Sequence, residues 1–189
     1  MIRHIRTALV ATIALLLPAA AQAHPGHELA SPLVSGLLHP LTGADHLIAM
    51  VMVGLWGGML AGRAKWAAPV AFVGAMVIGF GYALLGQPAG LAEGGILLSV
   101  LVLGLVLALR VKASWAVAAA VTGAFGFAHG MAHGLEAPAG DVATFAFGFV
   151  AATAALHALG VVIGSRVPAQ ALRAMGAVGA GFAVFLLAA

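Results

Sequence analysis

The chain has 189 residues, of which 63% are hydrophobic and only 7% are charged, and it contains no cysteine. Soluble domains carry roughly a quarter charged residues and disordered chains are polar and charge-rich, so this composition excludes both classes. The lack of cysteine excludes disulfides, thiolate metal sites and cysteine nucleophiles. Lipid is therefore expected to contact most of the protein surface.

The N-terminal segment has the pattern of a secretory signal peptide. Arg3 and Arg6 precede an apolar stretch over residues 8–20, and Ala21-Gln22-Ala23 then provides an A-x-A cleavage site. An apolar stretch of about 13 residues is short for a membrane span. We therefore expect residues 1–23 to be removed, as in a bacterial inner-membrane protein whose mature N-terminus faces the periplasm.

Residues 24–189 are expected to form a single all-α transmembrane domain. Six apolar segments are each close to the ~20 residues that cross a bilayer as a helix. They cover residues 43–61, 66–86, 92–110, 114–134, 142–164 and 170–189. Short breaks that carry proline, glycine or charge separate them, which predicts a polytopic membrane protein with six transmembrane helices.

The charges at these breaks predict the orientation. The basic residues after the signal lie in or beside the first, third and fifth breaks: Arg63, Lys65, Arg110, Lys112, Arg166 and Arg173. The acidic residues lie on the opposite side: Glu28, Asp45, Glu93, Glu136 and Asp141. Because basic residues favour the cytoplasmic side, both termini are expected to be periplasmic. The basic residues form no continuous patch, so nucleic acid is not an expected partner.

The first polar cluster lies at the start of the first span. His39, Asp45 and His46 fall within eight residues, and ionisable groups inside a membrane are costly and usually functional. On an unbroken helix the two histidines would lie about 10 Å apart, too far to share one metal ion.

Two residues inside this cluster predict a break in the helix. Pro40 and Gly43 disfavour a continuous helix, so we expect a short helix near residues 32–38 and a spanning helix that begins near Gly43. The turn between them can bring the two histidines together. Thr42 and Asp45 have the spacing of a capping box. The structural alternative is that Asp45 only caps the helix and that His46 lies at the membrane interface.

The second polar cluster lies at the end of the fourth span. His129 and His133 are four residues apart, so both imidazoles project from one helix face and can bind one ion. Glu136 follows at the helix end. Because the fourth span runs outward, this cluster lies near the periplasmic side, at a depth similar to the first. A shared metal site is predicted, although a lone buried histidine is more often a hydrogen-bonded core residue.

Four further residues are weaker candidates for metal ligands. His24 and His27 form either a capture site near the mature N-terminus or part of a leader without a role. Glu93 opens the third span, where capping competes with ligation. His157 lies alone in the fifth span and is either a relay on the exit path or a hydrogen-bonded core residue.

Other residues are expected to be structural. Gly126, Gly130 and Gly134 lie four apart on one face of the fourth span, as in a helix-packing seam. Anchors at the membrane interface are expected to be the three tryptophans, Trp56, Trp66 and Trp115.

The available ligands restrict the metal and the function classes. Imidazole and carboxylate suit Ni(II), Co(II), Zn(II) or Cu(II) and disfavour Cu(I). A transporter fits these ligands, and the chain has no nucleotide-binding P-loop. The alternative is a membrane metalloenzyme or a metal sensor. The enzyme class is disfavoured because the chain has neither H-E-x-x-H nor G-x-S-x-G, and we expect no enzymatic activity.

The two clusters also match the motifs of a known family. H-x5-D-H is matched by His39, Asp45 and His46. The longer pattern F-H-G-x-[AV]-H-G-x-E is matched by His129, Gly130, Ala132, His133, Gly134 and Glu136, with the aromatic residue one place early at Phe127. In these motifs the chain resembles the HupE/UreJ family of hydrogenase and urease accessory nickel permeases. The resemblance implies Ni²⁺ uptake from periplasm to cytoplasm, with Co²⁺ or Zn²⁺ as alternative substrates and no resident cofactor.

Overall fold

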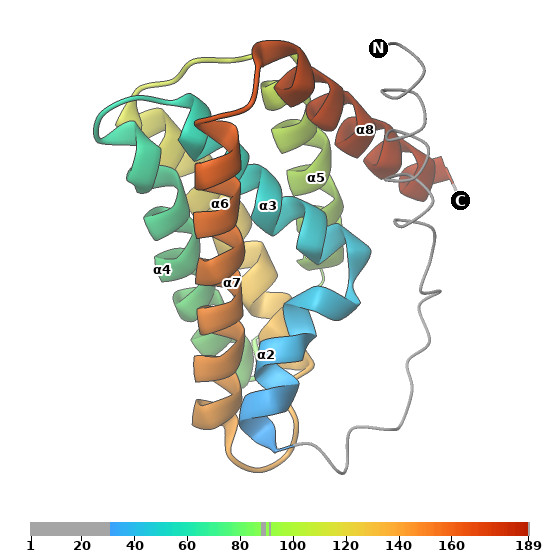
Figure 1. Cartoon of the computed structure of the whole chain (residues 1–189). Coiled ribbons are helices and arrows are strands. Elements are labelled where there is room, and N and C mark those ends of the chain that lie inside the picture. Colours follow the sequence, from blue (N-terminus) through green and yellow to red (C-terminus); the bar gives the residue numbers. More distant parts are fainter. Residues whose placement is uncertain (1–30, 88–89, 91, 189) are drawn as a thin grey trace.

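The computed structural model describes residues 31–87, 90 and 92–188, and the regular structure within them is entirely helical (Figure 1). The helices are α2 (Pro32–Thr42), α3 (Ala44–Met59), α4 (Ala64–Leu84), α5 (Ala92–Ala108), α6 (Trp115–Leu135), α7 (Val142–Gly164) and α8 (Ala169–Ala188). The expected signal peptide and the candidate ligands His24 and His27 lie outside the described residues.

The lengths and apolar composition of these helices make this a helical membrane protein. Four of them, α4, α6, α7 and α8, are each long and apolar enough to cross a bilayer. Helices α2 and α3 reach the required length only together and are bent by 82° relative to each other. By length and composition, the described residues thus hold four spans, or five if the bent pair counts as one. The apolar α5 is shorter, at 17 residues.

The break between α2 and α3 agrees with the expected position but differs in its hydrogen bonds. Helix α2 continues to Thr42, with Pro40 buried inside it. The Thr42 hydroxyl donates to the His39 carbonyl at 2.8 Å, and the N-cap of α3 is Gly43, which offers no side chain. Asp45 instead accepts from the backbone N–H of its neighbour His46 at 2.7 Å. The expected capping box is therefore wrong, because Thr42 bonds back into the preceding helix.

Glycine seams hold neighbouring helices in backbone contact. A Cβ added at Gly126 or Gly130 of α6 would meet the carbonyl oxygen of Phe72 or Met76 in α4. At Gly134 it would lie 2.7 Å from the Ala83 side chain. The predicted seam on the fourth span is thus confirmed, and it fixes the face of α6 from which its histidines project.

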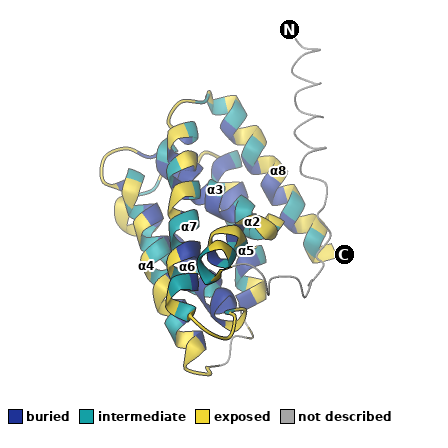
Figure 2. Ribbon diagram, turned by 60° about the horizontal axis from the view of Figure 1, so that its bottom comes forward, coloured by how far each residue is buried: buried dark blue, intermediate teal, exposed yellow. Residues whose placement is uncertain are grey.

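Two further helix pairs pack in the same way. A Cβ on Gly54 of α3 would lie 2.7 Å from the Cα of Gly160 in α7. A Cβ on Gly104 of α5 would lie 2.8 Å from the carbonyl oxygen of Gly176 in α8. Helix α3 consequently runs through the middle of the bundle, where Figure 2 shows it to be largely buried.

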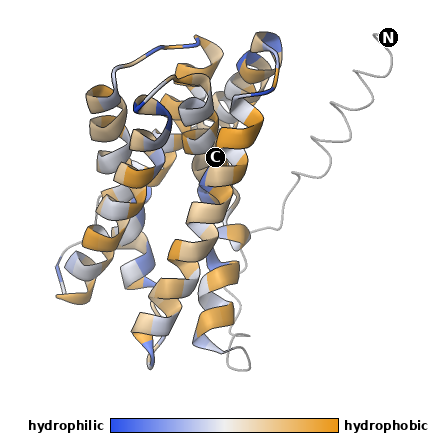
Figure 3. Ribbon diagram, turned by 60° about the vertical axis from the view of Figure 1, so that its left-hand side comes forward, coloured by the Kyte–Doolittle hydropathy of each residue, from blue (hydrophilic) through white to orange (hydrophobic). Residues whose placement is uncertain are grey.

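The turns divide between two ends of the bundle. The turns that join α3 to α4, α5 to α6 and α7 to α8 lie at the upper end of Figure 1. We call this the basic end because Arg63, Arg110, Arg166 and their basic neighbours fall in or beside these turns. The turns after α4 and α6 lie at the opposite end, the acidic end, which carries Glu136 and Asp141. Figure 3 shows most of the hydrophilic colour near these turns, as expected if lipid surrounds the helices.

One interface expectation is wrong. Trp66 and Trp115 are more than half exposed, as expected for interfacial anchors, but Trp56 is only 2% exposed. Its indole N–H donates to the Val111 carbonyl at 3.0 Å. Trp56 is therefore a core residue near the basic end, and its indole N–H is hydrogen-bonded within the protein.

Candidate functional site

The bend between α2 and α3 brings the first polar cluster against α6. His39 lies in the last turn of α2 and His46 in the first turn of α3. Their rings pack against His133 of α6, with centroid distances of 4.8 and 5.0 Å. The break thus lets both histidines approach one point, and the two polar clusters meet there.

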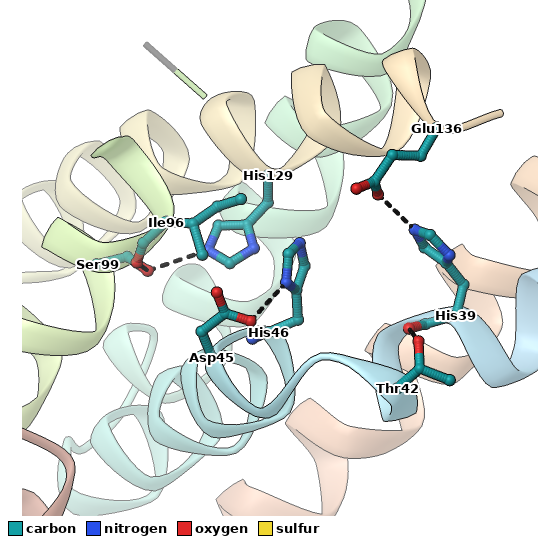
Figure 4. Close-up of polar contacts among 8 residues, drawn as sticks. All are labelled: His39, Thr42, Asp45, His46, Ile96, Ser99, His129 and Glu136. Carbon is teal, nitrogen blue, oxygen red and sulfur yellow. Dashed lines mark hydrogen bonds and ion pairs between the residues drawn. The ribbon is translucent and has the colours of Figure 1, made fainter. Parts of the chain in front are cut away.

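The outer part of the site faces the acidic end. His39 Nε2 donates to the half-exposed Glu136 carboxylate at 3.0 Å (Figure 4). This hydrogen bond lowers the pKa of the Glu136 carboxyl below its ordinary value. Potential ligand atoms of His39, His133 and Glu136 all lie within 4.8 Å of one another. These three side chains are therefore close enough to share a metal ion after small movements.

A small pocket leads to this group. Its volume is about 100 Å³, and it is lined by Ser35, His39, Thr42, Glu136, Pro138 and Phe145. The lining combines a carboxylate, an imidazole and two hydroxyls with apolar walls. The pocket therefore lies directly beside the His39–Glu136 pair.

The inner part of the site centres on His46 and His129, whose ring centroids are 5.1 Å apart. The Asp45 carboxylate lies 2.9 Å from His46 Nδ1. Because a carboxylate accepts, His46 carries its proton on Nδ1, and Nε2 keeps its lone pair. That Nε2 is buried and has no hydrogen-bond partner among the described residues.

Ser99 determines the corresponding tautomer of His129. The Ser99 hydroxyl donates its single hydrogen to the Ile96 carbonyl at 2.6 Å, so His129 Nε2, 3.0 Å away, must donate to Ser99 (Figure 4). The lone pair of His129 is consequently on Nδ1, which is buried and has no partner within the described part of the chain. Neither ring nitrogen of His133 has such a partner.

Within the described structure, three imidazoles of this site thus present buried ring nitrogens without hydrogen-bond partners. Buried polar groups are nearly always hydrogen-bonded, and exceptions often mark a functional site or an ion. Two of the three rings are oriented by a carboxylate or a hydroxyl on their other nitrogen, as is common for metal-ligating histidines. Phe72 packs against His129, Phe149 packs against His133, and Phe145 packs against His39, so aromatic rings form apolar walls of the site.

The remaining candidates lie outside this group. Glu93 is exposed in the first turn of α5, and no hydrogen bond or ion pair involves it among the described residues. His157 is buried in α7, where its ring contacts Phe72. Sequence reasoning missed Ser99, although a lone hydroxyl in the apolar third span was an available signal.

Comparison with known proteins identifies the family of the chain. The HupE / UreJ protein family matches residues 12–188. Protein HupE of Rhizobium leguminosarum bv. viciae is 42% identical over 153 residues, which cover 80% of this chain and 80% of that protein. No solved structure matches the chain. The resemblance inferred from the two motifs is confirmed, and the chain belongs to the HupE/UreJ family.

Proposed function

We propose that this protein is a permease that carries Ni²⁺, and secondarily Co²⁺, from the periplasm to the cytoplasm. Family membership supports accessory transport of nickel or cobalt in hydrogenase or urease systems. The observation that carries the proposal is that His46, His129 and His133 each have a buried ring nitrogen without a hydrogen-bond partner among the described residues. Neutral imidazoles and carboxylates suit Ni(II) and Co(II).

The proposed topology has six spans with both termini in the periplasm. The bent pair α2 and α3 forms the first span, and α5 crosses despite its 17 residues. The gathering of the basic turns at one end supports this orientation, because basic residues favour the cytoplasm. The acidic end then faces the periplasm, and residues 1–23 act as a cleaved signal.

The proposed binding sequence follows the order of groups in the site. Glu136 and His39 meet the hydrated ion in the pocket at the acidic end. Ring nitrogens of His133, His46 and His129 then replace part of its water shell. Asp45 holds His46 in the ligating tautomer and offsets the ion's charge. The chain has no P-loop, so the membrane potential is a candidate driving force, at about 2.3 kcal/mol per charge per 100 mV.

The test is Ni²⁺ entry into proteoliposomes that contain the full-length protein, His46→Ala or His133→Ala. Thr122→Val is the matched control on α6, because this buried hydroxyl bonds only to carbonyls away from the histidines. Saturable flux in the parent and the control, with at least tenfold less in both histidine variants, is expected. Ni²⁺ binding without flux in the parent would reject the permease and favour a sensor or an enzyme.

A further inference from the structure

We propose that His157 and Thr153 of α7 form a second, inner station for the transported cation, separated from the site described above by the ring of Phe72. This inference rests on the proposed transport function. The proposed station lies outside both polar clusters at the acidic end.

The first observation is that the two side chains are buried and lack hydrogen-bond partners among the described residues. His157 is 1% exposed and Thr153 is fully buried. They lie four residues apart in α7, on one helix face. Both ring nitrogens of His157 and the hydroxyl of Thr153 lack a hydrogen-bond partner among the described residues. In contrast, the buried Thr122 hydroxyl lies 2.8 Å from two carbonyl oxygens.

Such groups are unfavourable in an apolar interior unless something binds them. An unsatisfied polar group in a membrane protein costs free energy, and ionisable residues within spans usually serve a substrate path. A hydrogen-bonded core histidine was the structural alternative for His157. In the described structure neither nitrogen has a partner at normal hydrogen-bond geometry, although the Pro69 carbonyl lies near the ring, so His157 is not a fully satisfied core histidine.

The second observation is continuity with the outer site. Phe72 of α4 contacts His129, with ring centroids 5.1 Å apart, and also His157, with ring centroids 5.0 Å apart and planes at 90°. His157 is eight residues beyond Phe149, which packs on His133, a rise of about 12 Å along α7 toward the basic end. The histidines thus follow one another from the acidic end inward, with one aromatic ring between the last two.

The third observation is closure beyond His157. A Cβ on Gly54 of α3 would meet the His157 carbonyl oxygen, and on Gly58 it would lie 2.8 Å from the Ser165 backbone nitrogen. Helices α3 and α7 are therefore in backbone contact from His157 to the basic end. An ion at the inner station would leave only when these two helices separate.

The chemistry of the pair suits brief occupancy. One imidazole and one hydroxyl are fewer ligands than the outer site offers, and no carboxylate is among them. A cation at this station would keep several waters and bind weakly. Conduction requires binding that is favourable enough for entrance but weak enough for release.

His157→Phe is the decisive variant because it keeps an aromatic ring beside Phe72 and removes both unpartnered nitrogens. A packing role predicts normal flux. A station predicts at least tenfold lower Ni²⁺ flux into proteoliposomes, with Ni²⁺ affinity of the detergent-solubilised protein within twofold of the parent and an equal or higher Tm. Flux within twofold of the parent overturns the station. Loss of Ni²⁺ affinity along with flux also overturns it, since His157 would then support the outer site.

A second variant decides the question if His157→Phe does not fold. Thr153→Val keeps the side-chain shape and is expected to lower flux at least threefold, whereas Thr122→Val leaves it unchanged. Flux equal to the parent in Thr153→Val then overturns the station. Absence of flux from the parent itself is a separate outcome, which rejects the proposed function and the station with it.

Discussion

The contact between α4 and α6 at Gly130 can be tested by a single added methyl group. In Gly130→Ala the new Cβ would meet the Met76 carbonyl oxygen and would lie 2.7 Å from the Met76 carbonyl carbon and 2.8 Å from the Phe80 backbone nitrogen. Backbone atoms cannot rotate aside, so the helices must move apart. Overpacking costs about 1–3 kcal/mol, and replacing glycine by alanine in a helix returns up to about 1 kcal/mol. We expect a net loss of about 1–2 kcal/mol in the free energy of unfolding.

Gly123→Ala is the matched control on the same helix. A Cβ there would be 3.8 Å from its nearest neighbour, the Ala71 carbonyl oxygen, which is ordinary van der Waals contact. Its stability should be unchanged or higher by up to about 1 kcal/mol. Unfolding of both variants in mixed detergent micelles, followed by circular dichroism, gives the comparison.

The same variants test whether the seam positions the histidines. His129 and His133 flank Gly130 on α6, so separation of α4 and α6 should lower Ni²⁺ affinity in Gly130→Ala but not in Gly123→Ala. Equal stability and equal affinity in the two variants would refute the reasoning. The spacing of α4 and α6 would then not depend on the absence of a side chain at Gly130.

Three further outcomes are expected. His39→Leu should raise the pKa of Glu136 toward its ordinary 4.5, as followed by carboxyl ¹³C NMR. Since the folded-state pKa is depressed, the pair stabilises the fold above about pH 4.5, and this contribution is lost as the pH falls through the folded-state value. Asp141→Ala should lower the Tm through loss of the α7 N-cap, with the Tm of Asp141→Ser close to that of the parent. Trp56→Phe should lower the free energy of unfolding by about 1 kcal/mol through loss of the bond to the Val111 carbonyl, and an unchanged value would contradict this contact.

Features with local causes could be predicted from the sequence. The apolar segments became helices because each is long enough to satisfy its own backbone hydrogen bonds. Pro40 and Gly43 predicted a break near the first cluster, since both disfavour a continuous helix. His129 and His133 were expected on one helix face because residues four apart on a helix project in the same direction, which is also a local property.

Features that depend on a partner from another helix could not be predicted. The sequence places Trp56 among apolar residues close to a predicted break, which is typical of an interfacial anchor, but its indole meets the Val111 carbonyl inside the core. Ser99 is a single hydroxyl in an apolar segment, and only the packing of α5 on α6 shows that it orients His129. The Thr42 hydroxyl could accept from the backbone N–H of Asp45, as in a capping box, or donate to the His39 carbonyl. The structure shows the second arrangement, and sequence spacing does not distinguish the two.

The distribution of charge along the histidines bears on the proposed capture and release of a divalent ion. Glu136 contacts His39 at the acidic end, and Asp45 contacts His46 in the inner part of the site and lies near His129. Farther along, His157 has no carboxylate in contact in the described structure. An ion that advanced along this order would exchange charged ligands for neutral ones, and its binding would weaken at each step. A path lined by carboxylates throughout would retain the ion, because opposite charges in an apolar interior attract strongly. The decrease in negative charge from Glu136 toward His157 therefore favours the proposed transport over storage of the ion.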